Sequence, residues 1–123
     1  MNVTEHDFSG DWQWRSPDGR CENRIHLEVV DGKLAGCWTI GGVNAQSVWE
    51  TVDALLQDVQ LQGDTLLFKP GQTAPSRMTL QFVNANKITL GVDVSSLPAE
   101  IDVNDADVQK SLNRHRIDLT KVK

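Results

Sequence analysis

At 123 residues with 39% hydrophobic side chains, the chain is long enough for one domain and too short for two cores. Charged residues make up 24%, and no apolar run approaches the roughly 20 residues of a transmembrane helix, which excludes a disordered chain and a helical membrane protein. Seventeen acidic against twelve basic residues give a net charge of -5, which disfavours nucleic acids and anionic membranes as partners. We therefore expect a single domain over residues 1–123.

The opening third of the chain predicts a strand, a turn and a long hairpin. Every second residue from position 8 to position 14 is apolar or glycine, namely Phe8, Gly10, Trp12 and Trp14, and the residues between them are polar. This alternation is typical of a half-buried strand, and the following segment 16–19 supplies a turn. The pair Asp31-Gly32 then predicts a type I′ hairpin turn. The resulting register places apolar residues opposite each other, pairing Val29 with Leu34, Leu27 with Gly36 and Ile25 with Trp38.

The same register keeps the two cysteines apart. Cys37 falls opposite His26, and Cys21 lies too far along the strand for a direct disulfide. The first residues resemble no signal peptide, so the expected compartment is the cytoplasm, where structural disulfides are rare. We expect both thiols to be reduced and unpaired.

Two later hairpins follow the same logic. A turn at residues 63–64 pairs Leu61 with Leu66 and Val59 with Phe68. A turn through residues 84–86 pairs Phe82 with Ile88, Leu80 with Leu90 and Met78 with Val92. Ile117 and Leu119 alternate with polar residues and predict a last strand.

Two segments depart from strand alternation. Residues 47–56 combine capping-box spacing, from Ser47 to Glu50, with a helical apolar period, but they are also rich in strand-forming residues. A short helix is the preferred interpretation there, and a strand is the alternative. Residues 104–112 predict a second short helix that Asn104 caps.

These elements predict an all-β fold of seven or eight antiparallel strands, mostly in hairpin order, with one or two short helices. A sheet of this kind has to hide its edges by closing or by forming a sandwich. At this length, a small up-and-down barrel is the economical solution.

At Gly10 and Trp12 the opening strand resembles the Gly-x-Trp signature of lipocalins and related calycin barrels. In that family the tryptophan plugs the closed end of the barrel, and an arginine from near the last strand lies across it. The resemblance assigns that role to Arg114 or Arg116. The segment Gly63–Phe68 is also similar to small lipocalin-like bacterial domains of unassigned role.

Cytosolic fatty-acid-binding proteins resemble the chain in length and in the opening strand. They insert two lid helices after the first strand, where this chain has only a tight turn. Their carboxylate clamp ends in Arg-x-Tyr, whereas this chain has Arg116-Ile117-Asp118 and no tyrosine. An aspartate at that place would repel a carboxylate, so a fatty-acid carrier is disfavoured.

Aromatic side chains are the candidates for ligand contact. Five of them are candidates for lining a cavity or its rim: Trp14, Trp38, Trp49, Phe68 and Phe82. The preferred interpretation of those on strands is that they fill a narrow barrel. Trp49 falls off the apolar stripe of the possible helix, so it is expected at the rim, either touching a ligand or partner or packing on the barrel mouth.

Metal binding and catalysis have weaker support. His26, Glu28 and Cys37 share one sheet face and offer zinc-ligand types, but an exposed histidine is the preferred interpretation and no metal or cofactor is expected. The acidic run over residues 102–107 lacks the glycine and glutamate of a calcium loop. His115 falls on the same side of the predicted last strand as Ile117, which is expected to face inward, and this makes it a candidate for a buried general base. The preferred interpretation is a histidine with a structural role.

The sequence thus predicts a cytoplasmic binding module, for either a small apolar ligand or another protein. A solid-core accessory or interaction domain is the alternative, and an enzyme comes third.

Overall fold

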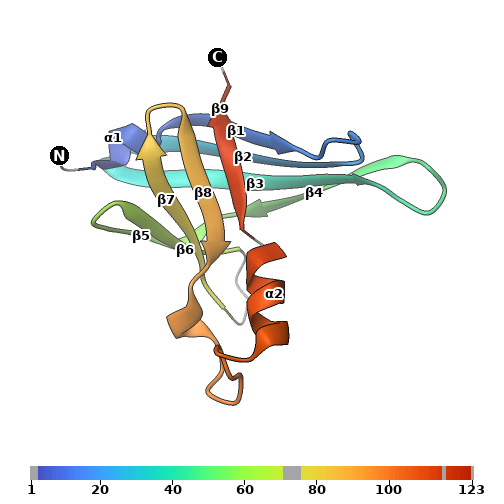
Figure 1. Ribbon diagram of the computed structural model, residues 1–123. Helices are drawn as coiled ribbons and strands as arrows, with labels where there is room; N and C mark the ends of the chain where they lie inside the picture. Colours follow the sequence, from blue (N-terminus) through green and yellow to red (C-terminus); the bar gives the residue numbers. More distant parts are fainter. Residues whose placement is uncertain (1–2, 71–75, 115, 123) are drawn as a thin grey trace.

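The computed structural model describes residues 3–70, 76–114 and 116–122. Nine strands form one antiparallel sheet in the order β4-β3-β2-β1-β9-β8-β7-β6-β5, and this sheet curls into a nearly closed up-and-down barrel (Figure 1). The strands are β1 (Gly10–Arg15), β2 (Cys21–Val30), β3 (Lys33–Val43), β4 (Trp49–Leu55), β5 (Gln57–Gln62), β6 (Thr65–Lys69), β7 (Met78–Asn84), β8 (Lys87–Val92) and β9 (Ile117–Lys121). The predicted all-β barrel is confirmed, with nine strands instead of seven or eight.

The two ends of the sheet, β4 and β5, are neighbours along the chain. Leu56 alone separates them, and its backbone N–H donates to the carbonyl of Gly36 at 3.0 Å. The pairing of β1 with β9 joins the two halves of the sheet. The remaining opening of the barrel lies between β4 and β5.

The first hairpin has the predicted register throughout, from Val30 opposite Lys33 to Ile25 opposite Trp38. The hairpin of β7 and β8 also pairs as predicted, at Phe82–Ile88, Leu80–Leu90 and Met78–Val92. In the hairpin of β5 and β6, Leu61 lies opposite Leu66, but the register shifts between Gln57 and Gln60. The predicted pair Val59–Phe68 falls inside this irregularity, where Asp58 takes a positive φ of 49°.

Residues 49–55 form strand β4, not the preferred helix. β4 pairs with β3 along its whole length, from Val43–Trp49 to Cys37–Leu55. The strand-forming residues of this segment therefore prevail over its helical period, because pairing with β3 satisfies their backbone groups.

The described residues also form three short helical segments: α1 (Glu5–Phe8), the 3-10 turn η1 (Val94–Ser96) and α2 (Ala106–Arg114). Phe8 ends α1 instead of opening β1, and its side chain is buried. α2 begins two residues later than predicted and Asp105, not Asn104, caps it by accepting from the backbone N–H of Asp107 at 2.8 Å.

The core fills the closed part of the barrel with side chains from both halves of the sheet. The largest fully buried members are Trp12, Phe8, Phe68, Ile25, Leu27, Leu66, Leu80, Ile88, Leu90 and Leu119. Trp12 anchors this set, because its indole Nε1 donates to the carbonyl of Phe8 at 2.8 Å.

Candidate functional site

The inner face of β1–β4 carries two successive cross-strand rows that differ in burial. The row inside the barrel consists of Trp12, Ile25, Trp38 and Ala54, and the next row consists of Trp14, Asn23, Ile40 and Val52. Trp12 and Ile25 are buried, whereas Ile40 is 45% exposed and Val52 is 67% exposed. The face that forms the core therefore continues past the closed part of the barrel and becomes open to solvent on β3 and β4, while Asn23 stays buried and Trp14 half-buried.

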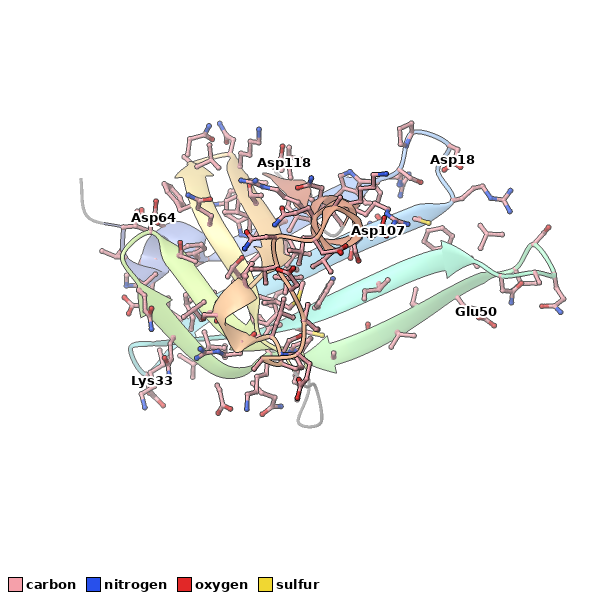
Figure 2. All side chains as sticks on the ribbon, turned by 60° about the horizontal axis from the view of Figure 1, so that its bottom comes forward. Asp18, Lys33, Glu50, Asp64, Asp107 and Asp118 are labelled. Atoms are coloured by element: carbon pink, nitrogen blue, oxygen red, sulfur yellow. The ribbon has the colours of Figure 1, made fainter. Side chains whose placement is uncertain are left out.

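This second row forms the floor of a groove. The groove has a volume of about 510 Å³ and is lined by Trp14, Cys21, Glu22, Asn23, Glu50, Val52 and residues 40–44. Much of this lining belongs to the long hairpin of β3 and β4, which extends beyond β7 and β8 (Figure 1). Glu50 and the Asp18 turn are both at this end of the molecule (Figure 2).

Polar groups around the groove are mostly acidic or already paired. Asn23 is buried, and its Oδ1 accepts from the indole Nε1 of Trp38 at 2.9 Å. On the neighbouring turn, hydrogen bonds from the Ser16 hydroxyl and the Arg20 backbone N–H lower the pKa of Asp18. The residues that line the groove include Glu22 and Glu50 but no lysine or arginine. Glu22 pairs with Arg15 and Arg24, which leaves Glu50 as the lining carboxylate without an ion pair among the described residues. The site therefore suits a neutral or cationic apolar group better than an anion.

Trp49 lies on the opposite face of the sheet from the groove. It pairs with Val43 at the start of β4, and its indole covers Gly41 on β3. A Cβ at Gly41 would come within 2.5 Å of the Trp49 Cζ2 atom, so the glycine leaves room for the ring. Trp49 remains 42% exposed.

The other predicted aromatic residues divide between the groove and the core. Trp14 lines the groove. Trp38 and Phe68 meet edge to face with ring centroids 6.2 Å apart, and Phe82 meets Phe8 in the same way at 5.8 Å. The structure thus brings Trp14 and Trp38 into neighbouring rows and leaves Trp49 on the outer face.

The cation over the Trp12 ring comes from β9. Lys121 Nζ lies 5.4 Å from the ring centroid, and its aliphatic chain crosses Gly10, where a Cβ would come within 2.8 Å of Lys121 Cε. Gly10 has φ +128°, which favours glycine. Arg114 is exposed at the end of α2, and Arg116 lines a groove of about 250 Å³ beside α2.

His26 is an exposed member of a polar outer face. Its Nδ1 lies 2.8 Å from Asp11 Oδ1, and its Nε2 lies 4.0 Å from Glu28 Oε2. Cys37 lies opposite His26, and Cys21 and Cys37 are both free thiols. Within residues 3–70, 76–114 and 116–122, no group of three or more His, Cys, Asp or Glu side chains could hold a metal ion. His115 lies outside the described residues.

Three groove residues were not among the predicted site residues, namely Asn23, Ile40 and Val52. The first hairpin register already implied that Asn23 faces Ile40, because it continues two residues beyond Ile25 opposite Trp38. Val52 could not be placed in this row while residues 47–56 were interpreted as a helix. Knowing that β4 is a strand would have completed the groove.

Comparison with known proteins gives no match: no family, curated protein or solved structure is significantly similar to this chain. In the part of the chain that the structure describes, no helix is both long and apolar enough to cross a membrane.

Proposed function

We propose that this protein is a lipocalin-like binding module that takes a neutral or cationic apolar ligand into the groove at the open end of its barrel. The observation that carries the proposal is the row of half-buried Trp14 and exposed Ile40 and Val52, which continues the core face and is lined only by residues of β1–β4 and the segments that flank these strands.

Exposure of this row is costly, since burying apolar surface stabilises a protein by about 25 cal/mol per Å². Contiguous apolar surface with a polar rim is typical of a binding site. A volume of about 510 Å³ falls within the range of small-molecule sites. Glu50 and the net charge of -5 disfavour carboxylate ligands such as fatty acids.

The packed contact between Trp38 and Phe68 supports binding at the barrel mouth in preference to its deep interior. The proposed compartment is the cytoplasm, in keeping with the two free thiols. The proposal assigns the protein no catalytic residue.

The test is titration with a neutral apolar dye, Nile red, followed by its fluorescence. Ile40→Asp places a charge on the groove floor and should weaken dye binding by at least about tenfold, because the lost apolar contact and the buried charge both oppose binding. The anionic dye anilinonaphthalene sulfonate should bind the unmodified protein more weakly than Nile red.

Val83→Asp is the matched control, because Val83 is an exposed valine on β7 and does not line the groove. It should leave Nile red affinity unchanged. The groove would be ruled out as the binding site if the unmodified protein, Ile40→Asp and Val83→Asp bound Nile red with equal affinity. It would also be ruled out if both variants lost affinity equally.

A further inference from the structure

The two edges of the sheet are protected to different degrees. The β5 edge is interrupted by the register shift around Asp58, whose carboxylate also pairs with Lys69 Nζ at 3.6 Å. Bulges and charged side chains of this kind block the addition of another strand. β4 (Trp49–Leu55) has no register shift, proline or glycine, and among the described residues it pairs with β3 alone. Its charged residues are Glu50 and Asp53, and the Asp53 carboxylate accepts a hydrogen bond from the Thr39 hydroxyl of β3 at 2.7 Å. The other side of β4 is called the free edge below.

Two hydrogen bonds at the ends of β4 fix which backbone groups face the free edge. Asn44 N–H donates to the Val48 carbonyl at 2.9 Å, and Leu56 N–H donates to the Gly36 carbonyl at 3.0 Å. Hydrogen-bonded positions alternate along an antiparallel ladder, so the even-numbered residues of β4 bond to β3. The odd-numbered residues direct their N–H and C=O groups toward the free edge, namely Trp49, Thr51, Asp53 and Leu55.

We propose that the free edge of β4 binds the same edge of a second copy of this chain, as an antiparallel strand pair with a twofold axis at Val52. In this register the outward-facing backbone groups of each copy meet those of the other. Val52 then faces its own counterpart on the inner face of the joined sheet.

Side-chain chemistry favours this register over its neighbours. It sets Trp49 opposite Leu55, Thr51 opposite Asp53 and Glu50 opposite Ala54 of the second copy, so apolar residues meet and no two carboxylates lie directly opposite each other. Directly opposed residues of an antiparallel pair lie on the same face of the sheet. The twofold axis can therefore pass only through a residue, and alternative registers place it at a neighbouring residue of β4.

Moving the axis by one residue removes this match. An axis at Asp53 would place two aspartates directly opposite each other, and an axis at Thr51 would place Trp49 opposite Asp53. Like charges in directly opposed positions destabilise a strand pair. A self-complementary sequence around one residue is what a twofold, isologous interface requires.

The exposed side chains of β4 supply the apolar part of the interface. Val52 and Leu55 are each 67% exposed, although both belong to a strand. One strand pair buries less than the roughly 800 Å² per partner of a standard interface, so the dimer is weak and its population depends on concentration.

Sedimentation equilibrium between about 10 and 300 µM measures this dimer, the range in which a weak interface dissociates. Thr51→Pro removes an N–H that faces the free edge without removing a bond to β3, and edge strands tolerate proline at such positions. It should weaken dimerisation by at least about tenfold. Thr51→Ala keeps the N–H and should remain a dimer.

Cross-linking tests the register independently of whether the proline variant folds. Val52→Cys, with Cys21 and Cys37 replaced by serine, should form an intermolecular disulfide on mild oxidation, because directly opposed Cα atoms at non-hydrogen-bonded positions lie about 4.5 Å apart. Val83→Cys in the same background should stay monomeric on non-reducing gels.

A protein that is monomeric throughout the concentration range, with no cross-link through position 52, would overturn the proposal. A dimer that survives Thr51→Pro in a folded protein and forms no cross-link through position 52 would also overturn it, since its interface would lie elsewhere. Neither measurement involves a groove ligand, so failure here leaves the proposed function untouched, and failure of dye binding leaves the dimer untouched.

Discussion

Trp12 and Trp14 lie two residues apart on the same face of β1, yet they belong to different regions of the molecule. Trp12 is fully buried and packs within the closed barrel, whereas Trp14 is partly exposed and lines the groove. Alternation along a strand determines which face a side chain occupies. Burial depends in addition on whether the opposite wall of the barrel reaches that level. In the first row Trp38 meets Phe68 of β6, whereas Ile40 and Val52 of the second row are exposed.

The largest expected difference between the two regions comes from truncating these tryptophans. Trp12→Ala should lower the free energy of unfolding by about 3–5 kcal/mol, through lost burial and the cavity left behind. It also removes the hydrogen bond to the Phe8 carbonyl and the ring under Lys121. Trp14→Ala should cost less than half as much. Urea unfolding monitored by circular dichroism measures both.

Both variants keep the remaining tryptophans, so the shared readout is secondary structure and not fluorescence. Equal losses of stability in Trp12→Ala and Trp14→Ala would show that the two rows are equally important for folding, and the distinction between closed barrel and open extension would fail.

Replacing either of two glycines on β3 with alanine adds a methyl group, and this compares packing in the closed barrel with packing in the open hairpin. At Gly36 a Cβ would collide with the backbone carbonyl of His26 and come within 2.8 Å of Leu27 Cδ2. At Gly41 the nearest atoms that it would meet belong to the part-exposed ring of Trp49, which can move. Gly36→Ala should therefore cost about 1–3 kcal/mol of stability. Gly41→Ala should cost clearly less, as measured by thermal and urea unfolding.

Gly41→Ala should also change the surroundings of the Trp49 indole, which shifts its emission spectrum. If Gly41→Ala proved as destabilising as Gly36→Ala, the hairpin extension would be as tightly packed as the barrel, contrary to its exposure.

The smallest effect is expected from a polar contact on the outside of the closed barrel. Hydrogen bonds from the Thr89 hydroxyl and Lys87 lower the pKa of the Asp118 carboxyl. A carboxyl whose pKa is lower in the folded state stabilises the fold above its unfolded pKa of about 3.9, and this contribution disappears as pH falls through the folded pKa. Because Asp118 is exposed, Asp118→Asn should cost only a few tenths of a kcal/mol at pH 7.

The difference in stability between Asp118→Asn and the unmodified protein should shrink as pH is lowered below about 4, where the carboxyl of the unfolded chain becomes protonated, and should vanish once pH has fallen through the lower pKa of the folded state. Lys87→Gln removes the ion-pair partner of Asp118. In this background Asp118→Asn should cost less stability at pH 7 than it does in the unmodified protein. A cost that stays constant down to pH 2 would mean that the ionised carboxylate contributes no stability of its own.

Hairpin registers could be predicted from the sequence because turn chemistry and apolar alternation specify the same pairing. Asp31-Gly32 and the facing apolar residues fix the first hairpin, and its predicted register is confirmed. The β5–β6 hairpin shows the limit of this reasoning. Its turn was correct, but the bulge at Asp58 depends on how the strand bends between Leu56 and β6, which no local pattern encodes.

The interpretation of residues 47–56 failed for a related reason. Capping-box spacing and a helical period are local signals, whereas β4 is held by pairing with β3. The same error hid the groove, because Val52 joins Ile40 only across that ladder. Trp49 was expected at the rim of the barrel mouth on a short helix, and its actual partner, Gly41, has no side chain that an apolar pattern would include.

The pairing of β1 with β9 has a consequence for synthesis on the ribosome. Every other neighbouring pair of strands in the sheet is also consecutive along the chain, so each can form soon after it emerges. β1 waits for a partner that lies about a hundred residues downstream, at Lys121 and Thr120. Nascent chains that stop short of β9 leave Trp12 without its lysine cover and expose one edge of β1 to aggregation. Translation past β9 is therefore the step that completes the barrel and shields this edge.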